Sequence, residues 1–576
     1  MAKHTYDFGV IGNCAFTAHI KKDTKVSWMC WPRFDSSFIF GGLLDEKKGG
    51  EFSALPMNED IESKQYYVEN TNVLCTEITC SSGKYKVTDF APRFLQYDRN
   101  YKPLMLVRKI EPIEGYPSIN VKCHPVGDYG KIIPEVSLGS SHIRYLGLDS
   151  QVRLTTNISL NYIINDQTFV LNETKYLVLS YGAPLEDSLE EATERFLSKT
   201  VDHWRKWVKT ASIVNFYQRA AIRSALILKI HQYEDTGAII AATTTSLPES
   251  PGAGRNWDYR YCWMRDTYYT LNAFNNIGHF EELEQYFHYI MNIISVEEDR
   301  FQPLYTISGQ KKLTEIEMDL DGYMGNQPVR TGNQAYTHIQ NDVYGQVLIS
   351  LLPLYSDKRI IFTERFDSTE IIFKALKMIE KTMEDPDAGL WEFRNLKQYH
   401  CYTYLFHWAG SKAAEKMADV LQNDEMRTLA IKLKDLACEK IEACYSPEKK
   451  GYAQAIGVDR MDASCLQLIN MNYLDGNSQR AKDHLIALEA ELKASNGLFY
   501  RYKHQDDFGE PETTFLICGF WYVEALACVG RLNEAIAAFE KLEGFSNHVG
   551  LLSEDVNEKD GSQWGNFPQE IGRAHV

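Results

Sequence analysis

The chain lacks any long hydrophobic run, since no stretch of 18 apolar residues occurs among its 576 residues. No membrane-spanning helix is therefore expected. No apolar segment follows Met1–Asp7, so we expect no secretory signal and a cytoplasmic location. Proline (18) and glycine (36) are few, which excludes collagen-like and low-complexity classes.

Positive charge is also scarce, because 61 Lys and Arg face 78 Asp and Glu and leave a net charge of −17. This balance disfavours nucleic acid as a partner, since a phosphate backbone attracts basic surfaces. The 12 cysteines are scattered from Cys14 to Cys528 and include no C-x-x-C pair. That pattern favours free thiols in a reducing compartment over disulfides or a zinc site. No H-E-x-x-H or similar motif is present, so we expect no metal and no cofactor.

What remains is globular material, with 44% hydrophobic and 24% charged residues, in a chain long enough for several domains. Residues 1–184 have the alternation typical of strands. One hairpin is predicted around Ser81–Gly83, and a second long pair, Val152–Ile164 and Thr168–Tyr181, around Asn165-Asp166. Several strands without intervening helices predict an antiparallel β-sandwich.

The periodicity changes near Leu185. Residues 185–214 are predicted as a helical linker, and residues 215–569 as a domain of helices joined by short loops. Counted in the order of the ranges given below, the even-numbered helices are rich in aromatic and small residues, whereas the odd-numbered ones are amphipathic. A ring of helical hairpins requires such an alternation of inner and outer helices. The eleven predicted helices cover 216–234, 265–277, 279–296, 340–355, 367–384, 400–421, 424–444, 463–474, 477–494, 511–529 and 531–542.

Four loop segments carry residues suited to chemistry. Arg255–Asp266 combines four aromatic residues with three arginines and two aspartates. Such a mixture suits a sugar, which presents an apolar ring face and paired hydroxyls. It equally suits a buried ion-pair network at the start of a helix, with Asp266 favoured by the helix dipole. Composition leaves both interpretations open.

The other segments supply carboxyl groups and a polar loop. In Gly389–Arg394, Glu392 stands between two large aromatic residues, and desolvation there would raise its pKa toward that of a general acid. Gly550–Asp555 contains Glu554, and a pair of carboxyl groups is what acid-assisted glycosidic cleavage needs. Tyr323–Asn333 is a candidate cleft wall. The alternative for the glutamates is that they are ordinary surface residues, and the alternative for Tyr323–Asn333 is that it is an ordinary loop crossing the surface.

Taken in this order, these segments resemble glycoside hydrolase family 15, which includes glucoamylases and trehalases. Ile11–Ser36 resembles the trehalase-like N-terminal domain that precedes that catalytic domain. The resemblance implies an α+β multidomain protein with an N-terminal β-sandwich and an (α/α)6 barrel. It implies inverting hydrolysis with Glu392 as general acid and Glu554 as general base. The residues that it places at the substrate are Tyr259, Trp263, Arg265, Asp266, Trp391 and Arg501.

Three departures from the family pattern stand out. Phe393 replaces a second glutamate, and Met324 replaces a loop tryptophan, both of fungal glucoamylases, which puts starch-type subsites in doubt. Where family members continue into a last helix, this chain ends in Glu570–Val576, which resembles a translated sequencing adapter. We therefore expect 570–576 to be a non-native tail that packs poorly, and the barrel to lack its last helix.

The sequence favours an exo-acting enzyme that releases glucose from the non-reducing end of α-glucosides, either maltooligosaccharides or trehalose. One alternative is a disaccharide phosphorylase, although a carboxylate at Glu554 would repel phosphate. Another is an inactive sugar-binding protein, although both glutamates are present. The expected partner is an oligosaccharide or disaccharide, and oligomeric state is left open.

Overall fold

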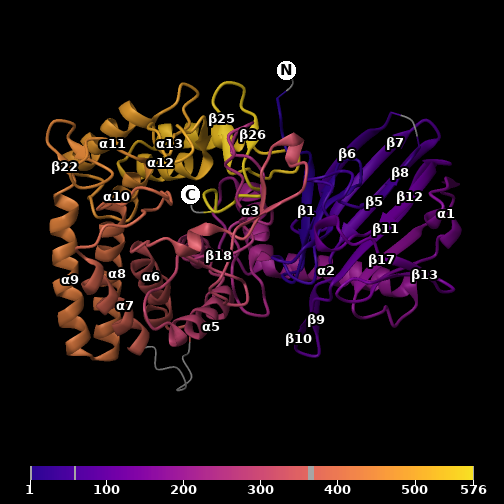
Figure 1. The fold of residues 1–576 in the computed structure, drawn as a ribbon, viewed down its shortest axis with the longest axis horizontal. Coiled ribbons are helices and arrows are strands. Elements are labelled where there is room, and N and C mark those ends of the chain that lie inside the picture. Colours follow the sequence, from indigo (N-terminus) through magenta and orange to yellow (C-terminus); the bar gives the residue numbers. More distant parts are fainter. Residues whose placement is uncertain (1–2, 58–59, 361–368, 575–576) are drawn as a thin grey trace.

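The computed structural model describes residues 3–57, 60–360 and 369–574. Strands β1–β17 occupy one side of the molecule and helices α4–α13 the other (Figure 1). The change occurs between β17 (Lys175–Tyr181) and α2 (Leu189–Lys209). This is the α+β architecture that the sequence predicts.

Three antiparallel sheets form most of the N-terminal half, and a small hairpin of β9 (Phe94–Gln96) and β10 (Arg99–Tyr101) makes a fourth. One has four strands in the order β1-β2-β3-β4, one has eight in the order β13-β14-β15-β17-β11-β8-β7-β6, and one has three in the order β16-β12-β5. A single apolar core contains Ile11, Leu106 and Val121, one from each sheet, so the sheets pack face to face as a sandwich. Their strands are β1 Phe8–Gly12, β2 Thr17–Lys21, β3 Val26–Cys30, β4 Phe38–Phe40, β5 Glu51–Leu55, β6 Glu62–Tyr67, β7 Leu74–Cys80, β8 Gly83–Phe90, β11 Met105–Gly115, β12 Ser118–His124, β13 Glu135–Leu138, β14 His142–Leu146, β15 Val152–Thr156, β16 Phe169–Val170 and β17.

The two predicted hairpins differ in outcome. The turn at Ser81–Gly83 is confirmed, because β7 and β8 pair across it. The long strand over Val152–Ile164 is wrong: β15 ends at Thr156 and a short helix, α1 (Leu160–Ile164), follows. The apolar residues of α1 recur three and four positions apart, which is a helical spacing, so this run packs against β12 as a helix.

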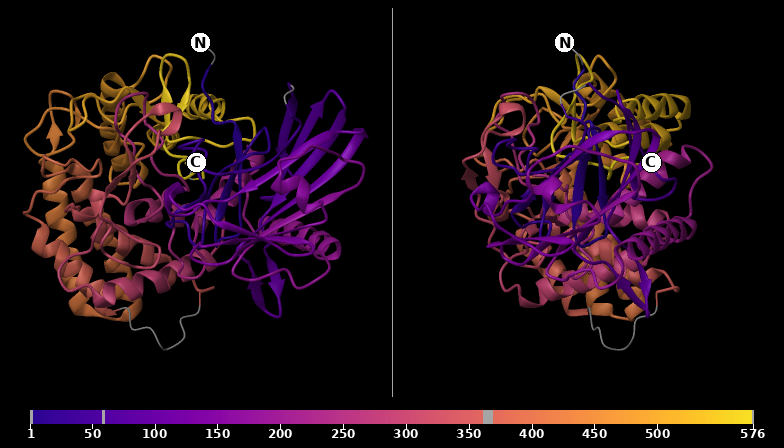
Figure 2. Two further views of the ribbon diagram at one scale, coloured as in Figure 1. Left: turned by 45° about the vertical axis from the view of Figure 1, so that its right-hand side comes forward. Right: turned by 90° about the vertical axis from the view of Figure 1, so that its right-hand side faces the viewer.

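Helix α2 connects the two halves. Its buried side chains include a row at intervals of four, namely Ala192, Phe196, Thr200, Trp204 and Val208, which lies along one face of a helix. The first two pack with the outer face of the eight-stranded sheet. The last two pack with α3 (Gln218–His231) and residues of β1. The connecting helix thereby holds the barrel against the sandwich, and two further views show the two halves side by side (Figure 2).

The helical half forms two concentric layers. Neighbouring contacts join α4, α6, α8, α10 and α12 in an inner layer, and α5, α7 and α9 in an outer layer. Eleven helices lie in the described residues of this half, as the periodicity predicts, although the start of the predicted helix 367–384 lies partly outside them. The helices are α3, α4 Met264–Asn276, α5 Glu281–Val296, α6 Asp342–Ser356, α7 Thr369–Thr382, α8 Cys401–Leu421, α9 Asp424–Glu442, α10 Gln467–Asn470 after a 3-10 turn, α11 Gln479–Leu492, α12 Leu516–Cys528 and α13 Leu532–Glu543.

Inner helices α6 and α8 approach each other very closely. A Cβ added at Gly410 would lie 2.5 Å from the Cα of Gly345, and one added at Gly345 would lie 2.0 Å from the carbonyl oxygen of Phe406. Only glycine fits at such a crossing. The contact brings together the loops that precede the two helices.

The remaining elements are short. Between residues 265 and 545, the described chain contains strands of only two or three residues, as a helical barrel requires. No helix within the described ranges is both long and apolar enough to cross a membrane.

The expectation that the C-terminal tail packs poorly is wrong for its described part, 570–574. Ile571 is 3% exposed and belongs to the core of the helical half. Arg573 is 2% exposed, pairs with Glu570 at 2.6 Å, and donates to Ser224 at 2.6 Å. An apolar side chain in the core and a neutralised guanidinium stabilise this segment. Residues 575–576 lie outside the described chain.

Candidate active site

A cavity opens where the loops before the inner helices α4, α6, α8 and α12 meet. Its lining comes from segments that are far apart in the sequence. All eight residues that the sequence places at the site line this one cavity: Tyr259, Trp263, Arg265, Asp266, Trp391, Glu392, Arg501 and Glu554.

Arg265 links the first two segments. It lies in the first turn of α4, where its guanidinium contacts Asp266 at 3.1 Å. The same side chain donates to the carbonyl oxygen of Leu390 at 2.9 Å and to Glu392 at 3.4 Å. One guanidinium therefore aligns the start of α4 with the loop that carries the proposed acid.

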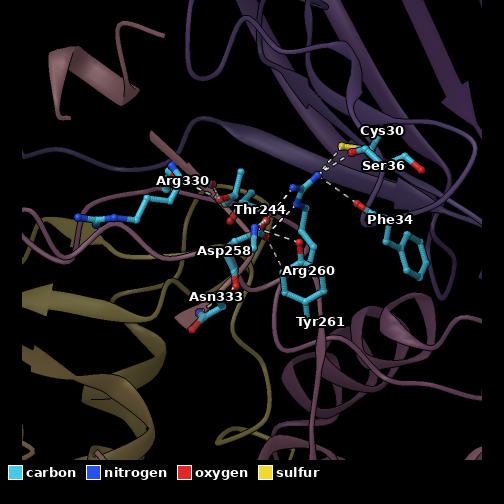
Figure 3. Close-up of polar contacts among 12 residues, drawn as sticks. Cys30, Phe34, Ser36, Thr244, Asp258, Arg260, Tyr261, Arg330 and Asn333 are labelled. Atoms are coloured by element: carbon cyan, nitrogen blue, oxygen red, sulfur yellow. Dashed lines mark hydrogen bonds and ion pairs between the residues drawn. The ribbon is translucent and has the colours of Figure 1, made fainter. Parts of the chain in front are cut away.

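Asp258 and Arg260 of the same segment do not line the cavity. Both side chains are fully buried and form an ion pair at 2.8 Å. Arg260 also donates to the carbonyl oxygen of Ser36 at 2.7 Å and to Tyr129 at 3.2 Å, both in the N-terminal half. Figure 3 shows this guanidinium between Asp258 and the segment Cys30–Ser36. The segment 255–266 thus satisfies both interpretations of its composition, as an ion-pair network and as a cavity wall.

Glu392 adopts a strained backbone conformation. Its φ is 60°, in the left-handed region that costs a non-glycine residue about 1–2 kcal/mol. The side chain is 24% exposed, and its Oε1 accepts a hydrogen bond from the indole of Trp263 at 2.8 Å. The carboxyl group therefore faces the cavity instead of being sealed between Trp391 and Phe393. Strain of this kind gathers at functional sites.

Glu554 is held in a different way. It is 1% exposed, and its two oxygens accept from the hydroxyl of Tyr259 at 2.6 Å and from the amide of Asn566 at 3.0 Å. Burial, together with the nearby charge of Glu249, raises its pKa, while the two donors act in the opposite direction. At Gly565, whose φ is 76°, an added Cβ would lie 2.7 Å from Oε2. Glycine there leaves room for the carboxyl group.

The two carboxyl groups are connected through a pair of aromatic side chains. Tyr259 donates to Glu554 and Trp263 donates to Glu392, and the two rings meet edge to face with centroids 5.5 Å apart. Two separate carboxyl groups on one cavity, with aromatic walls and an arginine beside them, can bind a sugar ring and transfer protons at both of its faces.

Several supporting residues carry no signal in the sequence. Glu249 forms a buried ion pair with Arg501. Asp462 accepts from the indole of Trp391 at 2.8 Å. Both lie in ordinary loops, and only the tertiary structure brings them to the site. Met324, by contrast, is 67% exposed and is absent from the cavity lining.

The described residues contain no group of three or more His, Cys, Asp or Glu arranged to hold a metal ion. The two carboxyl groups of the site can act as proton donor and proton acceptor.

The match to known families follows the two halves of the molecule. Residues 215–574 match the family described as Glycosyl hydrolases family 15, and residues 4–173 match that described as Trehalase-like, N-terminal. Fold and site thus define a glycoside hydrolase. The chain belongs to glycosyl hydrolase family 15 and carries a trehalase-like N-terminal domain.

Individual relatives agree over nearly the full length. The trehalase of Thermoplasma acidophilum is 32% identical over 569 residues, which cover 96% of this chain and 95% of that protein. The trehalase of Thermoplasma volcanium is 30% identical over 582 residues, which cover 99% and 92%. A bacterial glucoamylase complexed with acarbose superposes with a TM-score of 0.68 at 16% identity and covers 100% of this chain and 93% of that one. This last likeness concerns the fold alone.

Proposed function

We propose that this enzyme hydrolyses α,α-trehalose with inversion, with Glu392 as general acid and Glu554 as general base. The observation that carries the proposal is the pair of carboxyl groups on one cavity, each held by its own aromatic donor. The names of the Thermoplasma relatives support trehalose over a longer maltooligosaccharide.

In the proposed reaction, the glycosidic oxygen takes the proton of Glu392 as its bond to the anomeric carbon breaks. A water molecule on the opposite ring face gives its oxygen to that carbon and its proton to Glu554. Such a pair of carboxyl groups stands about 6.5–9.5 Å apart in inverting enzymes, which leaves room for the water. Each glutamate ends the cycle in the other protonation state, and exchange with solvent restores both.

The surroundings of Glu554 support its role as the base, and neighbouring side chains suit a sugar. Glu554 must be ionised to accept a proton, and the donors Tyr259 and Asn566 stabilise its carboxylate against the effect of burial. Arg265 and Asp266 offer a paired donor and acceptor for sugar hydroxyls. Trp263 presents an aromatic wall to the ring.

The stereochemistry of the products tests this mechanism. Trehalose joins two α-linked glucose units, so one inverting hydrolysis releases one β-glucose and one α-glucose. Proton NMR during the first turnovers is expected to show the two anomers in equal amounts. Initial release of α-glucose alone would indicate retention and would refute the mechanism.

A second experiment tests the acid and the substrate. Glucose release from trehalose, maltose and maltotriose is measured with and without phosphate, for the natural enzyme and for Glu392→Gln. We expect trehalose to be the best substrate, no requirement for phosphate, and a loss of about 10²–10⁴-fold in kcat for the variant. A variant with the natural rate would show that Glu392 is not the acid.

We also propose a cytoplasmic location. All twelve cysteines are free, which is typical of proteins in a reducing compartment. Labelling of an epitope-tagged chain in fractionated cells would test this.

A further inference from the structure

The outer end of the active-site cavity is covered by the segment Asp506–Gly509, which we term the cap. Phe508 of the cap lines the cavity and meets Trp257 edge to face, with ring centroids 5.0 Å apart. The guanidinium of Arg394 lies over both rings, 5.2 Å from the centroid of Phe508 and 4.8 Å from that of Trp257. These three side chains form a continuous rim.

Hydrogen bonds and an ion pair hold the cap in place from two sides. On one side, Arg255 donates to both oxygens of Asp506, at 2.8 and 2.6 Å, and to the carbonyl oxygen of Gly509 at 2.7 Å. On the other, the carboxylate of Asp507 accepts from the amide of Arg394 at 2.6 Å and from the side chain of Asn395 at 2.7 Å. Bidentate and charge-assisted bonds of this kind are directional, so they define where the cap lies.

The side chains of the cavity become more exposed toward the cap. Glu554 and Arg501 are 1% and 8% exposed, whereas Asp507 is an exposed residue. Asp507 of the cap therefore lies at the solvent end of the cavity, and the proposed base Glu554 lies inside.

The chain itself limits the distance between the proposed acid and the rim. The carbonyl oxygen of Leu390 binds Arg265, and Arg394 of the rim follows only four residues later. Four residues span at most about 14 Å when fully extended, and this segment is instead turned at Glu392. The rim therefore lies close to the proposed acid, and this short span limits the room for further sugar rings beyond the bond that is cleaved.

We propose that the cap restricts this enzyme to disaccharides, with Phe508 and Arg394 occupying the position that a third sugar ring would require. This inference rests on the proposed function. It makes Phe508 a determinant of substrate length and assigns no chemical step to it. Asp507 acts through Arg394 and Asn395, as a positioning residue for the cap.

The test compares substrates of increasing length. The kcat/KM values for trehalose, maltose and maltotriose are measured for the natural enzyme, Phe508→Ala and Asp507→Asn. Removal of the Phe508 ring should raise the ratio of maltotriose to maltose by about tenfold, the discrimination that one steric contact in a pocket provides. Asp507→Asn should raise it less, because the rim side chains remain. The matched control is Gln505→Ala, an exposed neighbour outside the cavity lining, which should leave the ratio unchanged.

Binding supplies an independent readout. Calorimetric titration of Glu392→Gln with maltose and maltotriose should give weaker binding of the trisaccharide, and the double variant with Phe508→Ala should remove that difference. Equal binding of both sugars before the ring is removed would overturn the proposal. So would an unchanged ratio in both cap variants. If the natural enzyme binds disaccharides with this length preference but hydrolyses none of them, the proposed function fails while the cap proposal stands.

Discussion

Replacing Tyr259 by phenylalanine isolates the electrostatics of the proposed base. The change removes one hydroxyl, which donates to Glu554 at 2.6 Å, and keeps the ring that packs against Trp263. A hydrogen bond to a charged group contributes about 1.5–3 kcal/mol, and about 1.4 kcal/mol corresponds to one pKa unit. The donor stabilises the carboxylate, so its loss should raise the pKa of Glu554 further, by about 1–2 units.

The sign of the effect on activity follows directly. A general base works only when ionised, so the acid limb of kcat/KM against pH should move upward by the same amount in Tyr259→Phe. The rate should fall most at low pH and recover as pH rises. Glucose release from trehalose, measured across the titration range of both forms, provides the profile. Tyr502→Phe is the matched control, because Tyr502 lines the same cavity but donates to Asp506. An acid limb that stays in place, or that moves downward, would refute this assignment of the base.

Three further predictions concern packing and buried charge. Gly565→Ala should abolish most activity and lower Tm, because a Cβ there would lie 2.6 Å from the side chain of the buried base; activity and Tm close to natural values would contradict the steric argument. Arg260→Met leaves Asp258 buried without its partner, so urea unfolding should show a loss of about 3–5 kcal/mol; a loss below that of an exposed arginine variant would count against it. Arg573→Met should lower the free energy of unfolding by a similar amount, because Glu570 would stay buried without its ion-pair partner; an unchanged unfolding midpoint would mean that the tail does not pack as described.

Much of the architecture can be predicted from the sequence because it depends on local periodicity. Apolar residues recurring every three to four positions mark helices wherever they occur, and the predicted 400–421 and 424–444 correspond to α8 and α9 within three residues. The same rule explains the error at Val152–Ile164. The β-rich composition of that run predicts a strand, whereas the apolar residues of Leu160–Ile164 have helical spacing.

The site residues followed from the resemblance to glycoside hydrolase family 15 that the dense segments carry. The aromatic and charged residues of Arg255–Asp266 suit either a sugar or an ion-pair network by composition, and six of them line the cavity. The sequence could not separate the structural pair Asp258–Arg260 from its cavity-facing neighbours. Adjacent residues in a loop can point to opposite sides, and which side each takes depends on partners such as Ser36 in the other half of the molecule.

The sequence alone determined the order of sandwich and barrel and the positions of the helices, because these follow from local spacing and composition. Only the tertiary structure decided that Glu249 and the cap lie at the cavity and that Asp462 accepts a hydrogen bond from Trp391. Contacts between distant segments depend on how whole elements pack, and a single carboxyl group in a loop has no periodic signal of its own. The close crossing of α6 and α8, the strained turn at Glu392 and the well-packed tail are likewise consequences of packing.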